Sequence, residues 1–468
     1  MTLRRTKRIM CAMCVVATLL LASACGQTDT RTTITVWSWE PSMKAVIKRF
    51  EAANPDIKVK LNNVSGYEHL NSAIQDGYGT PDVAQLEYFA LPQYAVSGQL
   101  LDITDRTAGY GEFYTPGTWS SVQLAGKVYA LPMDSGPMAF FYNEDVFNQA
   151  GVDATQIRTW DDYYEAAKKL KQIGVYIAAD AGDASFYDAM IWLAGGRPFQ
   201  TSPDGKTVTV NLMNDAGTRT FTSFWQRMID EDLVNTHLQT WSDRWKSALG
   251  DGSVASVFAG AWMPSLLLAD VPGTAGLWRV TRMPTVDGSS TNAENGGSAL
   301  SVLHTTRKPE AAFRFVEFVC HDKAGIDERV DGGAFPADNT TLSSSSFLQK
   351  TTIKDARGIA IPYFGGQEFN KVLSEAAESV SPGYHYLPFE VYARNDFRST
   401  VGKAYEWENI RQAYDEAKSK RDAGMTTANG GEITLPEKPG AKISLNAGLA
   451  LWQKDLKEYG YNQGFTIE

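Results

Sequence analysis

Short strand patterns alternate with amphipathic helix patterns from residue 33 onward, and this alternation limits the possible folds more than any other feature of the chain. Residues 33–38 and 57–61 have the composition of strands, and residues 41–54 between them place apolar side chains on one helical face. A strand, a helix and a second strand in this order form a parallel pair joined by a crossover helix. We therefore predict an α/β fold, in which helices layer a sheet.

The pattern continues over a length that one hydrophobic core does not fill. Further strand patterns occupy residues 82–86, 138–142 and 299–303, and each is followed by helical periodicity. Because single cores stop growing beyond about 250–300 residues, the 468 residues predict two lobes. The strand and helix near residue 300 resemble those of the first stretch, which predicts that the lobes are interleaved along the chain.

The N-terminal segment predicts export. Residues 1–24 combine a basic start, an apolar run at 9–21 and small residues at the end, as in a secretory signal peptide. The run is shorter than the about 20 apolar residues of a membrane span. Cys25 directly follows the predicted cleavage site and resembles the cysteine of a bacterial lipobox, although Ala22 stands where leucine is usual. We predict a lipid anchor at Cys25 and a tether at residues 25–32, on the extracellular face of the cytoplasmic membrane; plain secretion and an uncleaved anchor are the alternatives.

Charge and cysteine content exclude several classes of protein. Cleavage removes four of the 44 basic residues and none of the 54 acidic ones, which leaves a net charge near −14. Such an acidic chain lacks the basic surface that nucleic-acid phosphates require. Cys320 is the only cysteine of the body, so no disulfide can form within it, and its apolar helical surroundings predict a buried thiol rather than a nucleophile.

No motif of a known catalytic centre is present, so we predict a binding protein without cofactor or metal. Phosphate-binding loops, dinucleotide-binding glycines, zinc-binding pairs and nucleophile elbows are absent from the sequence. Glycoside hydrolysis needs only two carboxylates and therefore stays open as an alternative, an exported glycosidase. The carboxylates available for such a pair are Glu40, Glu87, Asp134 and Glu390.

Aromatic and acidic residues recur at the ends of two predicted strands. Trp39 and Glu40 follow the first strand, and Glu87 and Tyr88 end another. Open α/β sheets bind ligands at the carboxyl ends of their strands. A carboxylate accepts hydrogen bonds from sugar hydroxyls, and an aromatic face packs against the apolar side of a pyranose. The pairs therefore predict a sugar site.

Many short segments, in this order, resemble the carbohydrate-binding lipoproteins of ABC importers, the family 1 extracellular solute-binding proteins related in type to maltose-binding protein. They include Phe-Glu-Ala-Ala-Asn-Pro-Asp at 50–56, Gly-Lys-Val-Tyr-Ala-Leu-Pro at 126–132 and Gly-Ala-Trp at 260–262. The other segments are 34–37, 79–83, 97–102, 142–152, 159–162, 296–297 and 308–315. The resemblance covers most of residues 33–400.

The resemblance implies a two-lobed periplasmic-binding-protein-like fold that closes on a ligand around a hinge of three crossings. It places lobe 1 at residues 33–134 and 295–335, and lobe 2 at 135–294 and 336–468. The crossings are expected near residues 134–137, 287–294 and 334–339, where Gly, Pro, Ser and Asn are frequent. The implied function is capture of an oligosaccharide by a monomer and its delivery to the membrane permease subunits of an ABC importer.

The resemblance also assigns site residues. Trp262 matches a stacking platform of the second lobe, Asp134 a position that bonds sugar hydroxyls, and Gly296 with Gly297 a turn that lets backbone amides approach the ligand. One aromatic of Phe186, Tyr187 and Trp192 is expected in the cleft. The predicted ligand-binding residues are Trp39, Glu40, Tyr67, Glu87, Tyr88, Asp134, Tyr187, Trp192, Trp262, Gly296, Gly297, Tyr384, His385 and Asn395.

Two points stay open at the level of sequence. A binder of the same fold for a peptide, a polyamine or a metal ion is a further alternative, although Trp39, Tyr88 and Trp262 favour a sugar. The segment 422–440 has no counterpart in the resemblance and reads as a solvated loop.

Overall fold

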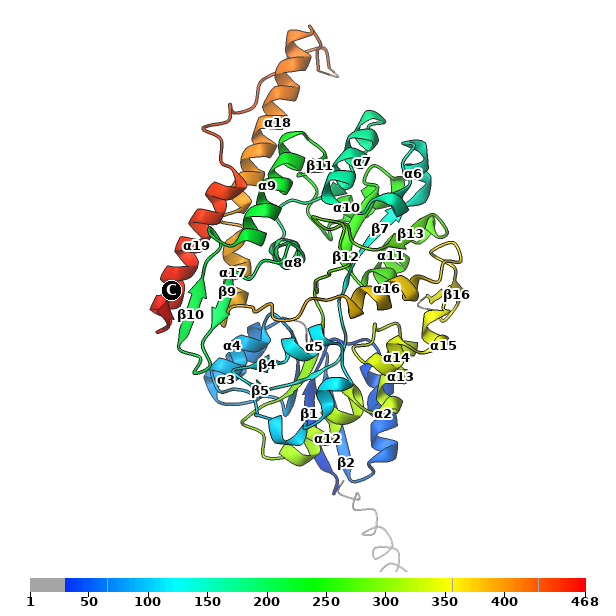
Figure 1. Ribbon diagram of the computed structural model, residues 1–468, viewed down its shortest axis with the longest axis vertical. Helices are drawn as coiled ribbons and strands as arrows, with labels where there is room; N and C mark the ends of the chain where they lie inside the picture. Colours follow the sequence, from blue (N-terminus) through cyan, green and yellow to red (C-terminus); the bar gives the residue numbers. More distant parts are fainter. Residues whose placement is uncertain (1–29, 65, 356, 428) are drawn as a thin grey trace, which may run out of the picture.

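Two separate sheets form the cores of two lobes, which lie one above the other along the longest axis of the molecule (Figure 1). The computed structural model describes residues 30–64, 66–355, 357–427 and 429–468. The predicted signal peptide, the lipid site Cys25 and most of the tether lie outside these residues. The predicted α/β two-lobed fold is confirmed.

Lobe 1 is built on a five-stranded sheet. Its strands, in order across the sheet, are β2 (Ile57–Asn62), β1 (Thr32–Trp37), β3 (Val83–Glu87), β14 (Ser298–Val302) and β6 (Leu131–Pro132). β1 pairs in parallel with β2 and β3, whereas β14 pairs antiparallel with β3 and β6. β14 is buried along its whole length, so a strand that begins at residue 298 completes a sheet begun at residue 32. The predicted interleaving of the lobes is confirmed.

Aromatic side chains join distant helices of lobe 1 into one core. The elements around the sheet are α2 (Met43–Ala53), α3 (Glu68–Asp76), α4 (Leu91–Val96), α5 (Pro116–Ser121), β4 (Gln123–Leu124), β5 (Lys127–Val128), α12 (Pro309–Cys320) and α13 (Lys323–Asp331). Phe50 packs edge-on against Phe315 and Phe318, with ring centroids 5.1 and 5.4 Å apart. Cys320 ends α12 as a buried thiol, as predicted, and burial raises its pKa to about 12.

Lobe 2 contains a three-stranded antiparallel sheet and its own helices. The strands are β12 (Ser256–Gly260), β7 (Met138–Asn143) and β13 (Trp278–Thr281), and the helices near them are α6 (Glu144–Gln149), α7 (Trp160–Gln172), α10 (Asp243–Asp251), α11 (Met263–Asp270) and α16 (Phe369–Glu378). A capping box between Thr159 and Asp162 fixes the start of α7. The fully buried β7 is the central strand.

The rest of lobe 2 is mostly helical. Its elements are β8 (Ala178–Ala179), α8 (Ala184–Leu193), β9 (Phe199–Thr201), β10 (Thr207–Val210), α9 (Ala216–Asp230), β11 (Val234–Asn235), α17 (Glu390–Phe397), α18 (Gly402–Asp422), α19 (Leu445–Asn462) and β17 (Thr466–Ile467). Four short elements lie between α13 and α16: α14 (Asn339–Leu342), α15 (Ser345–Leu348), β15 (Ile353–Lys354) and β16 (Ala360–Ile361).

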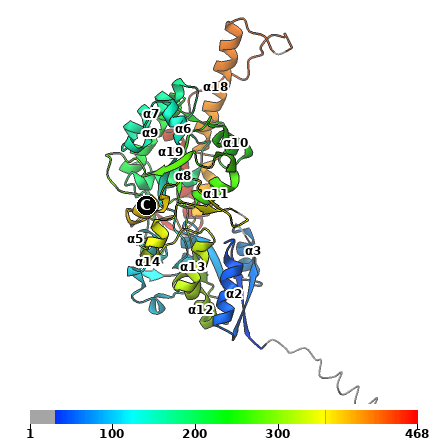
Figure 2. The same ribbon diagram turned by 90° about the vertical axis from the view of Figure 1, so that its right-hand side faces the viewer.

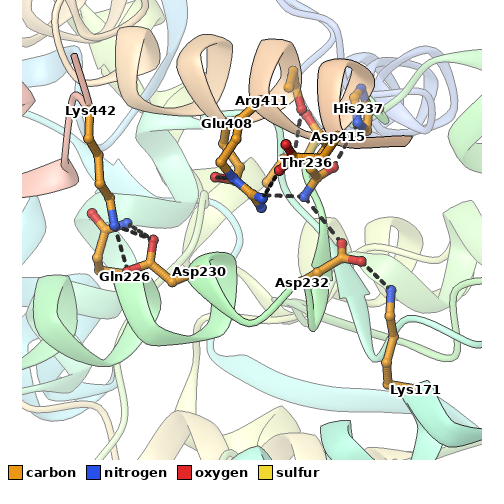
Figure 3. Close-up of polar contacts among 12 residues, drawn as sticks. Lys171, Gln226, Asp230, Asp232, Thr236, His237, Glu408, Arg411, Asp415 and Lys442 are labelled. Carbon is orange, nitrogen blue, oxygen red and sulfur yellow. Dashed lines mark hydrogen bonds and ion pairs between the residues drawn. The ribbon is translucent and has the colours of Figure 1, made fainter. Parts of the chain in front are cut away.

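The longest helix, α18, projects from lobe 2 at the end of the molecule opposite to the start of β1 (Figures 1 and 2). Its base is held on the lobe by polar side chains, among them the Asn409 amide, which bonds Thr236. Lys442, beyond the helix, binds Asp230 at 2.8 Å (Figure 3). Across the described residues, none of the helices has the length and apolarity needed to cross a membrane.

Two chain crossings between the lobes run side by side as an antiparallel pair. The Met138 amide donates to the Ala293 carbonyl at 3.0 Å, and the Asn295 amide donates to the Gly136 carbonyl at 2.7 Å. They match the crossings predicted at 134–137 and 287–294. The third connection follows α13, where Tyr114 and Asp338 form a bridge. The exact lobe boundaries stay a prediction.

Candidate functional site

A cavity of about 570 Å³ lies between the lobes. The ends of β1 and β3 line it from lobe 1, and β12, the start of α8 and the loop before α10 line it from lobe 2. The predicted site residues that line it are Trp39, Glu40, Glu87, Asp134, Trp262, Gly296 and Gly297. The tertiary structure therefore brings together residues that are up to 258 positions apart in the chain.

A buried glutamine fixes the lobe 1 rim of the cavity. Gln85 Oε1 accepts hydrogen bonds from Ser38 Oγ at 2.6 Å and from the Trp39 amide at 3.1 Å. Gln85 Nε2 donates to Ser298 Oγ at 2.9 Å. The loop that presents Trp39 and Glu40 is thus tied to β3 and β14. Sequence reasoning missed Gln85, although its place two residues before Glu87 on the strand is a usable signal.

Glu87 faces the cavity from the end of β3, and Tyr67 orients it. The Tyr67 hydroxyl donates to Glu87 Oε2 at 3.0 Å. Burial raises the pKa of Glu87, and the positive charge of Arg394 and the Tyr67 hydrogen bond act against this rise. Burial also raises the pKa of Tyr67 well above its usual value, so its hydroxyl stays a donor. Tyr67 itself does not line the cavity.

Two carboxyl groups meet at the hinge. Asp134 accepts hydrogen bonds from the Ser298 amide at 2.5 Å and from Ser298 Oγ at 3.0 Å. Glu294, which sequence reasoning missed, accepts from Ser135 Oγ at 2.8 Å and from the Gly136 amide at 2.5 Å. Burial raises the pKa of both carboxyls to about 7, and the nearby charge of Glu40 also raises that of Asp134. Of the two, Asp134 lines the cavity.

Trp262 is held by a hydrogen bond, and two glycines leave the space that its ring occupies. Its Nε1 donates to the Asn295 carbonyl at 2.7 Å. A Cβ atom on Gly260 would lie 2.4 Å from Trp262 Nε1, and one on Gly296 would lie 2.9 Å from it. A Cβ on Gly297 would lie 2.5 Å from the Tyr88 ring. The double glycine therefore makes room for aromatic rings, and its predicted role toward ligand through backbone amides stays a prediction.

Two further tryptophans extend the aromatic wall of lobe 2. The Trp241 ring lies 5.0 Å from that of Trp245 and 5.5 Å from that of Trp262, with planes inclined at 60° and 52°. Trp241 is 43% exposed and lines the cavity with the other two. Sequence reasoning missed Trp241 and Trp245, although two tryptophans four residues apart at a helix start are a usable signal.

Phe186 is the aromatic of α8 that lines the cavity. Tyr187 is buried and bonds Thr222 at 2.7 Å, and Trp192 donates to the Ser381 carbonyl at 2.7 Å. Of the three aromatic candidates on α8, Phe186 therefore faces the cavity, whereas Tyr187 and Trp192 point to other parts of the lobe. Nearby, the buried Asp180, also missed from the sequence, lines the same wall.

The other predicted ligand contacts do not line the cavity. Tyr88 is buried and donates to the Asp134 carbonyl at 2.7 Å, and Tyr384 stacks on Trp192 with centroids 4.8 Å apart. His385 and Asn395 are exposed side chains at or near α17. The residues outside the cavity are Tyr67, Tyr88, Tyr187, Trp192, Tyr384, His385 and Asn395. The five tyrosine and tryptophan side chains among them pack against or orient neighbours, and contact of all seven residues with ligand stays a prediction.

The lining combines aromatic faces with hydrogen-bond acceptors. Carboxyl groups come from Glu40, Glu87, Asp134, Asp180 and Asp183, and no Lys, Arg or His lines the cavity among the described residues. An anionic solute would find no opposite charge there, which makes its burial costly. Over the same described parts of the chain, no group of three or more His, Cys, Asp or Glu is arranged to hold a metal ion.

Comparison with known proteins matches the sequence to one family. The family model described as bacterial extracellular solute-binding protein matches residues 37–325. A lactose-binding protein of Rhizobium radiobacter is 25% identical over 67% of this chain and 75% of its own. An arabinooligosaccharide-binding protein of Bacillus subtilis is 24% identical over 83% of this chain and 88% of its own.

Solved structures share the fold along almost the whole chain. A binding protein associated with an ABC transporter of B. animalis subsp. lactis, solved in complex with beta-1,6-galactobiose, is 48% identical; the match covers 94% of this chain and 100% of that one, with a TM-score of 0.77. A lacto-N-biose complex of a Bifidobacterium longum binding protein matches with a TM-score of 0.70 at 23% identity, over 94% and 99% of the two chains. The chain therefore belongs to the bacterial extracellular solute-binding protein family.

Proposed function

We propose that the protein captures an oligosaccharide between its lobes and delivers it to the permease subunits of an ABC importer. The observation that carries this proposal is the cavity wall, where Trp241 and Trp262 of lobe 2 share one cavity with the acceptors Glu40 and Glu87 of lobe 1. Aromatic faces take the apolar side of a sugar ring, and carboxylates accept from its hydroxyls. The volume of about 570 Å³ lies within the range of small-molecule sites, about 300–1,000 Å³.

A β-linked galactoside disaccharide is the ligand class that the relatives favour. The protein that is 48% identical was solved with beta-1,6-galactobiose, and one of the curated relatives is a lactose-binding protein. Both ligands are neutral, which agrees with a lining whose described residues carry no positive charge. A polyamine is the second candidate, because the same acidic lining would attract a cation.

Calorimetry separates these ligands directly. The panel is β-1,6-galactobiose, lactose, an arabino-oligosaccharide, spermidine and glycerol phosphate, each titrated into the protein without its signal peptide. We expect the neutral galactosides to bind and glycerol phosphate to give no heat. Binding of spermidine alone, with no neutral sugar bound, would replace the sugar proposal by the polyamine.

Capture without chemistry distinguishes this function from that of an exported glycosidase. We expect each bound oligosaccharide to be recovered intact after long incubation with the protein, because the family and its relatives are binding proteins. Chromatography of the sugar gives the answer. Release of a monosaccharide would transfer the assignment to Glu87 and Asp134 as candidate catalytic carboxyls.

The family places the chain outside the cytoplasmic membrane. We infer that a lipid on Cys25 anchors it there. We also infer that the protein is a monomer. A tethered capture protein stays within reach of its importer, whereas a freely secreted one diffuses away. Mass spectrometry of the mature N-terminus tests the anchor, and light scattering of the lipid-free protein tests the monomer. An N-terminus other than a diacylated or triacylated Cys25 would refute the anchor.

A further inference from the structure

The loop between β11 and α10 carries Trp241 into the cavity in a backbone conformation that an L residue rarely adopts. Trp241 has a φ of +71°, in the left-handed region. Such a residue keeps this conformation only where its surroundings hold it, and such residues are frequent at ligand clamps. The residue is still 43% exposed, so packing of the side chain alone does not account for its position.

Two side chains of the projecting helix α18 hold the start of this loop. Thr236 Oγ1 donates to Asn409 Oδ1 at 2.6 Å, and Asn409 Nδ2 donates back to the Thr236 carbonyl at 3.1 Å. His237 Nε2 and Gln412 Oε1 lie 2.8 Å apart (Figure 3). Residues three apart on a helix lie on one face, so Asn409 and Gln412 hold consecutive residues of the loop together.

A second layer of polar contacts stiffens this junction. Gln412 Nε2 also donates to Asp232 Oδ1 at 3.2 Å and to Glu408 Oε1 at 2.9 Å. Asp232 in turn accepts from Lys171 Nζ at 2.7 Å, in the network that Figure 3 shows. Both ends of β11 are therefore tied to α18 or α7, and the loop leaves from a fixed starting point.

The same helix supports the cavity wall at a second place. The Tyr405 hydroxyl, one turn before Asn409, donates to Asp180 Oδ2 at 2.7 Å. Trp225 Nε1 donates to the same oxygen at 2.8 Å. No residue of α18 lines the cavity, yet through these contacts the helix braces Asp180 and the loop of Trp241 from behind.

We propose that α18 is a positioning element of the ligand site: Asn409 and Gln412 are positioning residues that hold loop 236–242 so that Trp241 presents its ring to the bound sugar. The inference rests on the proposed function, because Trp241 acts on a sugar in that cavity. A ring fixed before the ligand arrives loses less freedom on binding, which strengthens binding without a new contact. The role of α18 is thus mechanical, and Asn409 and Gln412 act on the ligand only through Trp241.

The test combines affinity with a measurement on the ligand-free protein. In Asn409→Ala, hydrogen exchange of the amides at 236–242 should be faster than in the wild type. Binding of β-1,6-galactobiose, followed by calorimetry, should weaken by about tenfold, because the platform is no longer preorganised. In a Trp241→Ala background, Asn409→Ala should weaken binding no further. If Asn409→Ala also lowers the thermal midpoint, Thr236→Val takes its place in the test. This nearly isosteric change removes the donor of the 2.6 Å hydrogen bond, and it should likewise speed exchange at 236–242 and weaken binding.

The matched control is Lys420→Ala, on the exposed outer part of the same helix, where Lys420 pairs with Glu416. It should leave both exchange and affinity unchanged. A wild-type dissociation constant in Asn409→Ala would overturn the inference, and so would an equal loss of affinity in the presence and absence of Trp241. If neither the wild type nor any variant binds the sugar, the proposed function fails. In that case, exchange at 236–242 that is unchanged in Asn409→Ala would overturn the inference independently.

Discussion

At the scale of single residues, the site depends on how its aromatic rings are fixed. Trp262 can lie where it does because residues 260 and 296 carry no side chain and because the Asn295 carbonyl accepts its indole hydrogen. The ring is therefore a platform set by its neighbours. Two substitutions test separately the contribution of the Trp262 ring and that of the space beside it.

Trp262→Ala should weaken sugar binding by about tenfold to a hundredfold, since a stacked aromatic face contributes roughly 1.4–2.8 kcal/mol at such a site. The fold should be kept, because the indole is only partly buried at the cavity. Calorimetry with β-1,6-galactobiose and a thermal melt measure the two effects. An unchanged dissociation constant would show that Trp262 is not a ligand platform.

Gly296→Ala should lower both stability and affinity. The residue has a φ of +86°, and the added Cβ would lie 2.9 Å from Trp262 Nε1, so the ring must move. Gly276→Ala is the control: its φ is +91°, but its Cβ would meet no atom within 4 Å. Both variants should lose about 1 kcal/mol of unfolding free energy or more through backbone strain. Equal affinities of the two variants would contradict the proposed need for space beside Trp262.

At the scale of elements, the two crossing segments at 133–138 and 292–298 both pair with each other and carry acidic side chains. Their backbone pairing forms the hinge, and each carries a carboxyl group, Asp134 or Glu294, whose pKa burial raises to about 7. Hydrogen bonds from Ser135, Gly136 and Ser298 hold these carboxyls. The hinge should therefore be sensitive to pH near neutrality.

The sign of this sensitivity follows from linkage. Between its ordinary pKa of 4.5 and the raised value of about 7, Glu294 keeps a proton in the native state that the unfolded state has lost. The free energy of unfolding therefore falls as the pH rises from about 5 to 8, because each tenfold difference in proton affinity between the two states contributes up to about 1.4 kcal/mol. In Glu294→Gln this fall should be smaller, as measured by urea unfolding at several pH values.

Glu432→Gln, an exposed change in the loop after α18, serves as the control and should keep the wild-type pH profile. A profile of Glu294→Gln parallel to that of the wild type would show that Glu294 does not titrate in this range.

At the scale of the whole molecule, the lobes also touch apart from the hinge. Arg394 of lobe 2 lies 3.8 Å from the centroid of the Phe89 ring of lobe 1. Asp188 and Glu390, at 3.2 and 3.4 Å, hold the guanidinium from its own lobe. Figure 1 shows α17 and the β9–β10 hairpin at this boundary, above α4. The contact links the lobes without using the ligand.

Phe89→Leu should weaken sugar binding by about threefold to tenfold. The variant loses a cation–π contact of about 0.5–2 kcal/mol, which favours the arrangement in which both lobes line the cavity. Phe89→Tyr keeps the aromatic face and should bind like the wild type. Calorimetry and the radius of gyration of the ligand-free protein report on the two variants. The same affinity in Phe89→Leu as in Phe89→Tyr would exclude a role for this contact.

The sequence by itself determined the α/β class, the two interleaved lobes, and a set of cavity residues that includes Trp39, Glu40, Glu87 and Trp262. These follow from features that are local in the chain: the periodicity of apolar residues, the ends of strands and the order of short segments. The position of β14 beside β3 was predictable only in outline, from the repeated texture near residue 300.

Only the tertiary structure decided which side chains face the cavity. Tyr187 and Trp192 lie on the same helix as Phe186, but contacts with Thr222 and Ser381, 35 and 189 positions away, turn them inward. Trp241 enters the wall because Asn409, 173 positions after Thr236, holds its loop. Such contacts join residues whose approach depends on the packing of whole elements, and no local pattern along the chain specifies it.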